Sequence, residues 1–168
     1  MDNEPDNTRY EIVSGRYSIE RERADNLNSR AVQAVGISGT LMALLLGLGN
    51  TTLANVQKTN SLLPWLRGIL ILGMLMFGVD LFVFLLAYRI RKYRTDPDPR
   101  GVIGELANLN QSELICQVTA NIVGATYENY LINNSKARVI RRGLDFLGAS
   151  IFLMVVFGVI LVVALSMQ

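Results

Sequence analysis

The stretch FLGASIFLMVVFGVILVVALSM, residues 146–167, contains no charged side chain. Two other stretches have a similar composition: AVQAVGISGTLMALLLGLGNTTLA, residues 31–54, carries no charge, and GILILGMLMFGVDLFVFLLAY, residues 68–88, carries one, Asp80. About 20 mainly apolar helical residues are enough to cross the hydrocarbon core of a bilayer. The sequence therefore predicts an all-α integral membrane protein with three transmembrane helices.

The composition agrees with this class and disfavours an enzyme. The 168 residues are 51% hydrophobic and 18% charged, whereas a soluble domain is usually about 45–50% apolar and about 25% charged. Histidine, the commonest acid–base group and metal ligand near neutral pH, is absent. The single cysteine, Cys116, excludes an intrachain disulfide and a cysteine-based zinc site. We therefore predict no enzyme activity, no cofactor, no metal site and no nucleic-acid partner.

The basic residues fall mainly on one side of the predicted spans. Fourteen of the 16 Lys and Arg residues lie before the first span or between the second and third, and only Lys58 and Arg67 lie in the first connection. Cytoplasmic connections carry the excess of Lys and Arg in multi-pass proteins. The N-terminus is therefore predicted to be cytoplasmic and the C-terminus outside, in the inner membrane of a bacterium or archaeon.

The residues outside the spans are predicted to form helices within a single membrane domain, residues 14–168. The preceding residues 1–13 are polar and contain a proline, which predicts a disordered tail. Helix formers from residue 14 onward predict a helix that continues into the first span. Residues 89–94 are predicted to extend the second span as helix until the sequence DPDP, because proline lacks a backbone donor. A short helix is expected within residues 101–110.

The third span is predicted to be the end of one long helix. No proline interrupts residues 112–168, and apolar residues recur near helical spacing between Leu114 and Ile140. The cytoplasmic part of this helix, within a cytoplasmic helical region at 89–145, is expected to pack against the helix that leads into the first span. The alternative is a kink at Gly143, near the membrane surface.

Asp80 is the most informative single residue because it lies near the middle of the second span. Charge is costly at that depth and normally faces protein or water. Asp80 is therefore a candidate pore-lining or proton-sensing carboxylate, and several copies would form a ring of acids. The alternative is a structural role, in which a protonated Asp80 forms a hydrogen bond with a polar residue of another span. The candidate partners are Ser38, Thr40, Asn50 and Ser150.

Small residues recur along the first span. They are Gly36, Gly39, Ala43 and Gly47. Small residues let helix backbones approach closely in a membrane, so this side of the first span is expected to pack against another helix.

A basic cluster precedes the third span and consists of Lys136, Arg138, Arg141 and Arg142. Each such residue gains on the order of 1 kcal/mol near anionic lipid. The cluster is therefore expected to face lipid and to set the topology. The alternative is a binding site for an anionic messenger.

Two short motifs precede the first and third spans. The positions that define them are Asn28 and Arg30 in the first motif, and Asn129, Asn133 and Lys136 in the second. The second follows the pattern N-x-x-x-N-x-x-K-A, and the first stands where a D-x-K-A pattern would stand, with asparagine and arginine in place of aspartate and lysine. This layout is similar to that of small multi-pass bacterial membrane effectors of antiphage defence, the Pycsar transmembrane effectors and the related SLATT proteins.

The resemblance implies a membrane effector that is switched on by a nucleotide second messenger or a soluble sensor partner and then breaches the inner membrane. Three spans are too few to enclose a pore, so copies of the chain are expected to assemble around an axis. We therefore predict an oligomeric inner-membrane effector or channel that permeabilises the membrane when triggered. The alternative is a non-conducting membrane scaffold whose cytoplasmic helices dock a soluble partner.

Overall fold

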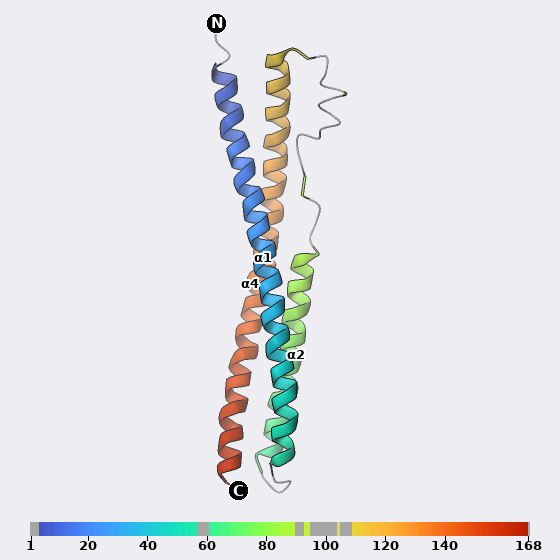
Figure 1. Cartoon of the computed structure of the whole chain (residues 1–168), viewed down its shortest axis with the longest axis vertical. Helices are drawn as coiled ribbons and strands as arrows, with labels where there is room; N and C mark the ends of the chain where they lie inside the picture. The colour runs from blue at the N-terminus through green and yellow to red at the C-terminus, as the bar shows by residue number, and fades with distance from the viewer. Residues whose placement is uncertain (1–3, 57–60, 90–92, 95–103, 105–108, 168) are drawn as a thin grey trace. The chain divides into compact units, whose positions relative to one another are not determined.

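The structure, a computed structural model, describes residues 4–56, 61–89, 93–94, 104 and 109–167. Its regular elements are three helices, α1 (Glu4–Asn55), α2 (Leu63–Tyr88) and α4 (Gln111–Ser166), shown in Figure 1. Each contains a segment long and apolar enough to cross a bilayer. The chain is therefore an all-α protein with three candidate membrane spans, as the sequence predicts.

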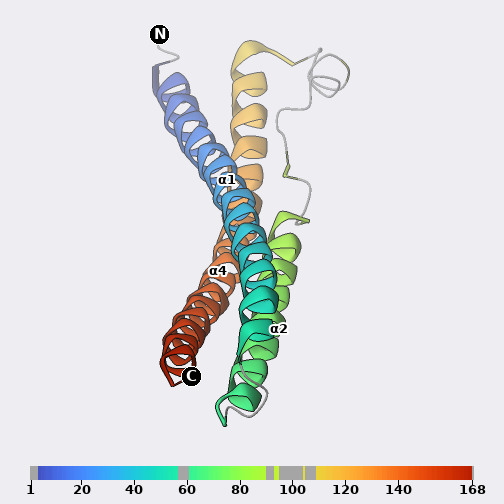
Figure 2. The same cartoon turned by 60° about the horizontal axis from the view of Figure 1, so that its bottom comes forward.

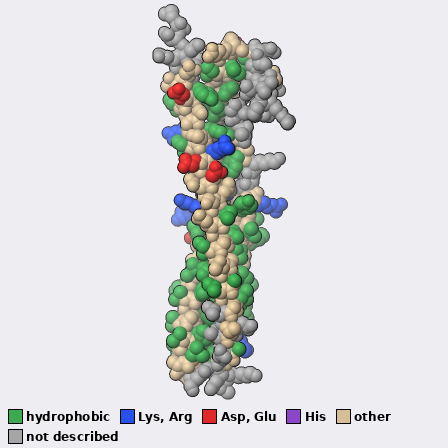
Figure 3. Space-filling model, viewed as in Figure 1, with side chains coloured by type: hydrophobic (Ala, Val, Ile, Leu, Met, Phe, Trp, Pro, Cys, Tyr) green, Lys and Arg blue, Asp and Glu red, His purple; other side chains and the backbone are tan. Residues whose placement is uncertain are grey.

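The chain forms two compact units, which we call the two-helix unit and the three-helix unit. The two-helix unit comprises Met1–Asn28 and Ile90–Ala137, and the three-helix unit comprises Ser29–Arg89 and Arg138–Gln168. Both α1 and α4 contribute residues to each unit. On the face shown in Figure 3, the side chains of the three-helix unit are mainly hydrophobic, and acidic side chains gather over the two-helix unit.

The three-helix unit is built around one buried side of α2. The buried residues of α2 recur every three or four positions: Leu63, Leu66, Leu70, Gly73, Phe77, Asp80, Phe84 and Ala87. This spacing places them on one helical face, which packs against α1 and α4. Figures 1 and 2 both show α1 and α2 side by side in this unit.

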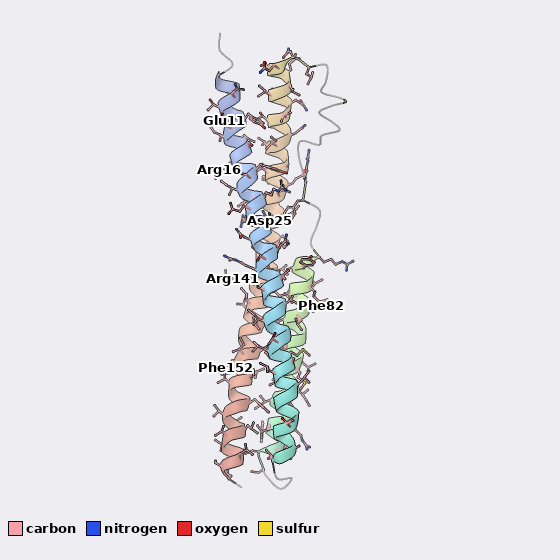
Figure 4. All side chains as sticks on the ribbon, viewed as in Figure 1. Glu11, Arg16, Asp25, Phe82, Arg141 and Phe152 are labelled. Atoms are coloured by element: carbon pink, nitrogen blue, oxygen red, sulfur yellow. The ribbon has the colours of Figure 1, made fainter. Side chains whose placement is uncertain are left out.

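The opposite faces of these helices are apolar as well. Phe82 of α2 is 61% exposed and Phe152 of α4 is 67% exposed, and both point away from the helices in Figure 4. A soluble monomer rarely leaves a contiguous apolar surface of this extent uncovered. Hydrocarbon is the solvent that suits such side chains.

The two-helix unit contains the first part of α1 and the first part of α4. Its apolar core is small and includes Ala24, Ile122 and Ala125, all buried. The contact between these parts of α1 and α4 confirms the packing predicted for the helix that precedes the third span. At the start of α4, Asn110 Oδ1 accepts a hydrogen bond from Glu113 N at 2.9 Å, and Glu113 Oε2 accepts one from Asn110 N at 3.3 Å. These reciprocal bonds form a capping box.

Two local expectations differ from the structure. Residues 4–13, predicted to be a disordered tail, belong to α1, because a proline in the first turn lacks only an amide that has no helical partner there. The helical extension predicted for 89–94 is not found where the structure describes it: α2 ends at Tyr88, and Tyr93 and Arg94 are not helical. Residues 90–92 lie outside the described residues. The helix expected within residues 101–110 and the DPDP sequence fall largely outside the described residues.

Asparagine and lysine side chains interrupt the apolar core of the two-helix unit. Asn129, Asn133 and Lys136 are four and three positions apart on α4, so they share one face of the helix. They are 3%, 0% and 0% exposed, respectively.

α4 continues without interruption through Gly143, which confirms the predicted long helix.

Candidate functional site

Asn129 binds the backbone of the segment that follows α2. Its Oδ1 accepts a hydrogen bond from Arg94 N at 3.1 Å, and its Nδ2 donates one to Arg94 O at 3.1 Å. Tyr17 of α1 donates from its hydroxyl to the same carbonyl at 3.2 Å. The Arg94 guanidinium lies 3.0 Å from Glu128 Oε1. Residue 94 is therefore held through its backbone amide and carbonyl, which any residue except proline presents, as well as through its side chain.

Asn133, one helical turn further along α4, joins α1 to Tyr93. Its Nδ2 donates to Glu20 O at 2.9 Å and to Glu20 Oε2 at 2.8 Å. Its Oδ1 accepts from the Tyr93 hydroxyl at 2.9 Å. Both ends of the buried amide are thus satisfied, as a buried polar group requires.

Lys136 completes the row and is fully buried. Its ammonium donates to Asn28 Oδ1 of α1 and lies 6.0 Å from the centre of the Tyr93 ring. No carboxylate in the described residues forms an ion pair with it. Burial lowers the pKa of Lys136, because removal from water disfavours its charged form.

Tyr93 lies between these groups. Burial raises the pKa of its hydroxyl, and the negative charges of Asp25 and Glu20 raise that pKa further. A cavity of about 210 Å³ adjoins the ring and is lined by Tyr17, Arg21, Ala24, Asp25, Tyr93 and Asn129. This volume lies below the range of about 300–1,000 Å³ that is typical of small-molecule sites.

We call Asn28, Tyr93, Asn129, Asn133 and Lys136 the polar cluster. Four of its five members belong to the two motifs that the sequence analysis singles out. Sequence reasoning missed Tyr93, Tyr17 and Glu20 as partners, because their contacts join residues far apart in the chain.

The other motif and basic residues lie elsewhere. The Arg30 side chain is exposed and belongs to the three-helix unit, so it does not join the polar cluster. Arg138, Arg141 and Arg142 are also exposed, and Arg141 points away from the helices in Figure 4. The grouping of Lys136 with these arginines is therefore wrong, because the aligned row with Asn129 and Asn133 turns Lys136 inward.

Asp80 is fully buried in the three-helix unit. Ser38 of α1, also fully buried, donates to Asp80 Oδ2 at 3.3 Å. Asp80 Oδ1 has no hydrogen-bond partner in the part of the chain that the structure describes. Of the four structural partners expected for Asp80, Ser38 is therefore confirmed.

The other expected partners of Asp80 are engaged elsewhere or not described. Thr40 donates to Gly36 O at 2.9 Å, and Ser150 donates to Phe146 O at 2.9 Å, each within its own helix. The Asn50 side chain lies outside the described atoms. One carboxylate oxygen thus has Ser38 as its partner, and the other has no side-chain partner among the described residues.

Three small residues of the first span, Gly36, Gly39 and Gly47, have no close neighbour among the described residues of the other helices. A Cβ atom added at Gly36, Gly39 or Gly47 would meet nothing within 4 Å. Close approach occurs instead at Gly143, where a Cβ would lie 2.7 Å from the Phe84 ring. Within the part of the chain that the structure describes, this side of α1 therefore has no close neighbour at Gly36, Gly39 and Gly47.

Comparison with known protein families, with curated proteins and with solved structures finds no match to this chain.

Proposed function

We propose that the chain is an oligomeric inner-membrane effector or channel that permeabilises the membrane when it is triggered. The burial of Asp80 carries this proposal. A carboxyl group within a span is costly, and a buried polar atom without a partner adds about 1–3 kcal/mol. An apolar residue would avoid both costs, so the presence of an aspartate at this position supports a role beyond packing.

In the packing described above, Asp80 is closed off inside one copy of the chain and faces Ser38. We place this packing at the resting state. Conduction then requires a second packing of α1 against α2 in which Asp80 lines a shared pore or exchanges a proton. A trigger shifts the protein between the two packings only if it binds one of them more tightly.

The uncovered small residues of α1 support assembly. Hydrocarbon solvates apolar side chains as well as a neighbouring helix does, so spans associate through close backbone contact and polar bonds. Gly36, Gly39 and Gly47 leave open space for such contact. A second copy of the chain is the proposed neighbour, since one copy has too few spans to enclose a pore.

The course of α1 and α4 supports triggering from outside the bilayer. Each helix contributes to the two-helix unit and to the three-helix unit. A nucleotide second messenger or a soluble sensor partner that alters the two-helix unit would therefore act on the helices that contain two of the spans. The resemblance of the two motifs to antiphage effectors supports defence as the setting, with the two-helix unit in the cytoplasm.

The test is membrane potential after induced expression, together with dye release from liposomes that contain the purified protein. We expect the wild type to depolarise cells and Asp80→Asn to reduce the effect at equal protein level. Asp145→Asn is the matched control, because Asp145 is an exposed carboxylate on α4. Unchanged potential in cells together with intact liposomes would refute the proposal.

A groove in the two-helix unit favours one alternative, a non-conducting scaffold. The groove is mainly apolar, has a volume of about 470 Å³, and is lined by Val13, Arg16, Ile19, Glu20, Val123, Thr126, Tyr127 and Tyr130. Tyr127 is 64% exposed, and exposed aromatic residues are common where proteins dock. Co-purification of a stoichiometric soluble partner, with membrane potential unaltered by expression, would favour the scaffold.

A further inference from the structure

We infer that Asn129 and Asn133 form a latch that holds the segment after α2 on the two-helix unit, and that opening this latch is the step that releases α2. The second part of this inference rests on the proposed function. The first part concerns binding within the chain and stands on the contacts alone.

The latch recognises the segment at two adjacent residues. Asn129 bonds both the amide and the carbonyl of Arg94, in the way that a neighbouring strand would. Asn133 accepts from the Tyr93 hydroxyl, and Tyr17 adds a second donor to the Arg94 carbonyl. Because Asn129 and Asn133 are buried, competition from water for these bonds is limited.

The latch restrains α2 through the covalent chain. Arg89 caps the end of α2 through its amide, which donates to Leu85 O at 2.9 Å. Tyr93 follows only four residues later, a distance that a chain spans with at most about 14 Å. A fixed Tyr93 therefore limits how far the end of α2 travels, and release of Tyr93 and Arg94 removes that limit.

The Arg94 backbone also supplies a reason why an asparagine, and not an aspartate, occupies position 129. Arg94 presents both a donor and an acceptor from its backbone, and an amide side chain matches both at once, whereas an ionised carboxylate only accepts. An aspartate at 129 keeps the bond from the Arg94 amide but places a second oxygen against the Arg94 carbonyl. Asn129→Asp is thus a nearly isosteric way to open the latch.

The test measures hydrogen–deuterium exchange of the peptide that contains Arg94, and tryptic cleavage after Arg94, in the full chain in nanodiscs. We expect Asn129→Ala and Asn129→Asp to raise both rates about tenfold, which corresponds to about 1.4 kcal/mol. Asn134→Ala is the matched control on the same helix, since Asn134 binds Arg23 at 2.8 Å and not the segment after α2. Rates that stay at the wild-type level in both Asn129 variants would overturn the latch.

If circular dichroism shows that an Asn129 variant has lost helix content, a variant outside the helices tests the latch instead. Tyr93→Phe removes only the hydroxyl that Asn133 accepts, and Tyr93 lies outside the helices. We expect exchange at Arg94 to rise about threefold, which is about 0.7 kcal/mol. Exchange equal to that of the wild type overturns the latch.

The coupling to α2 has its own readout, dye release from liposomes that contain the same variants. Faster exchange with raised basal release supports the coupling, and faster exchange with wild-type release overturns it while leaving the binding contact in place. The proposed function fails separately if neither the wild type nor any variant releases dye.

Discussion

The contact between α2 and α4 makes a quantitative prediction at Gly143. A Cβ atom at this position would lie 2.7, 2.8 and 3.0 Å from Cε1, Cζ and Cδ1 of Phe84, whereas carbon atoms in favourable contact are about 3.5–4.0 Å apart. Phe84 is fully buried, so its ring cannot turn toward solvent. Gly143→Ala is therefore an overpacking substitution.

The magnitude follows from a matched pair of glycines on the same helix. Replacing a helical glycine by alanine favours the helix by about 0.8–1.0 kcal/mol, and this gain is shared by Gly143→Ala and Gly148→Ala. A Cβ at Gly148 would meet nothing within 4 Å. Overpacking costs about 1–3 kcal/mol, so the free energies of unfolding of the two variants should differ by about that amount.

The assay is thermal unfolding in detergent micelles, followed by circular dichroism. A difference of about 1–3 kcal/mol corresponds to about 3–9 °C in a chain of this size, with Gly143→Ala the less stable variant. Phe84→Leu combined with Gly143→Ala should recover most of the difference, because the smaller side chain vacates the space. Equal melting temperatures for Gly143→Ala and Gly148→Ala would refute the contact between α2 and α4.

Three further predictions concern ionisable groups. Lys136 has a lowered pKa, so between that pKa and the usual value of 10.5 the unfolded chain binds more protons than the folded chain. The melting temperature should therefore rise with pH in this range, and Lys136→Met should abolish the rise. Tyr93 has a raised pKa, so above about pH 10 the folded state retains a proton that the unfolded state loses, and stability falls with pH; Tyr93→Phe should remove this fall, and an unchanged pH profile would contradict the burial of its hydroxyl. Arg141→Gln with Arg142→Gln should reduce the anionic lipid that native mass spectrometry detects on the purified protein, since each arginine contributes about 1 kcal/mol near anionic headgroups; unchanged lipid retention would contradict a lipid-facing role.

The three candidate spans could be predicted because a bilayer imposes a requirement on composition that is independent of tertiary contacts. A charge-free stretch such as 146–167 satisfies that requirement by itself. The shared face of Asn129, Asn133 and Lys136 also follows from spacing alone. The hydrogen bond between Lys136 and Asn28 could also have been predicted. Each residue belongs to one of the two motifs, and the helices that contain the motifs were expected to pack together.

The remaining contacts could not be predicted, because they depend on geometry that has no local signature. Asn129 binds backbone atoms of Arg94, and backbone atoms look the same at every position in a sequence. Which side of α1 is buried depends on where the side chains of the other helices pack against it. A Cβ atom added at Gly49 would lie 2.7 Å from Leu70 Cδ1, whereas one added at Gly36 would meet nothing within 4 Å. Both glycines belong to the same helix.

The central claim is that hydrocarbon surrounds the outer faces of the three-helix unit, and spin labels test it most directly. One label is placed at residue 152 in Phe152→Cys with Cys116→Ser, and another on the native Cys116, which is exposed in the two-helix unit. In lipid vesicles, we predict that oxygen relaxes the label at 152 more strongly than a water-soluble nickel chelate does, and that the order is reversed at Cys116. Equal access of the nickel chelate to both labels would contradict the account.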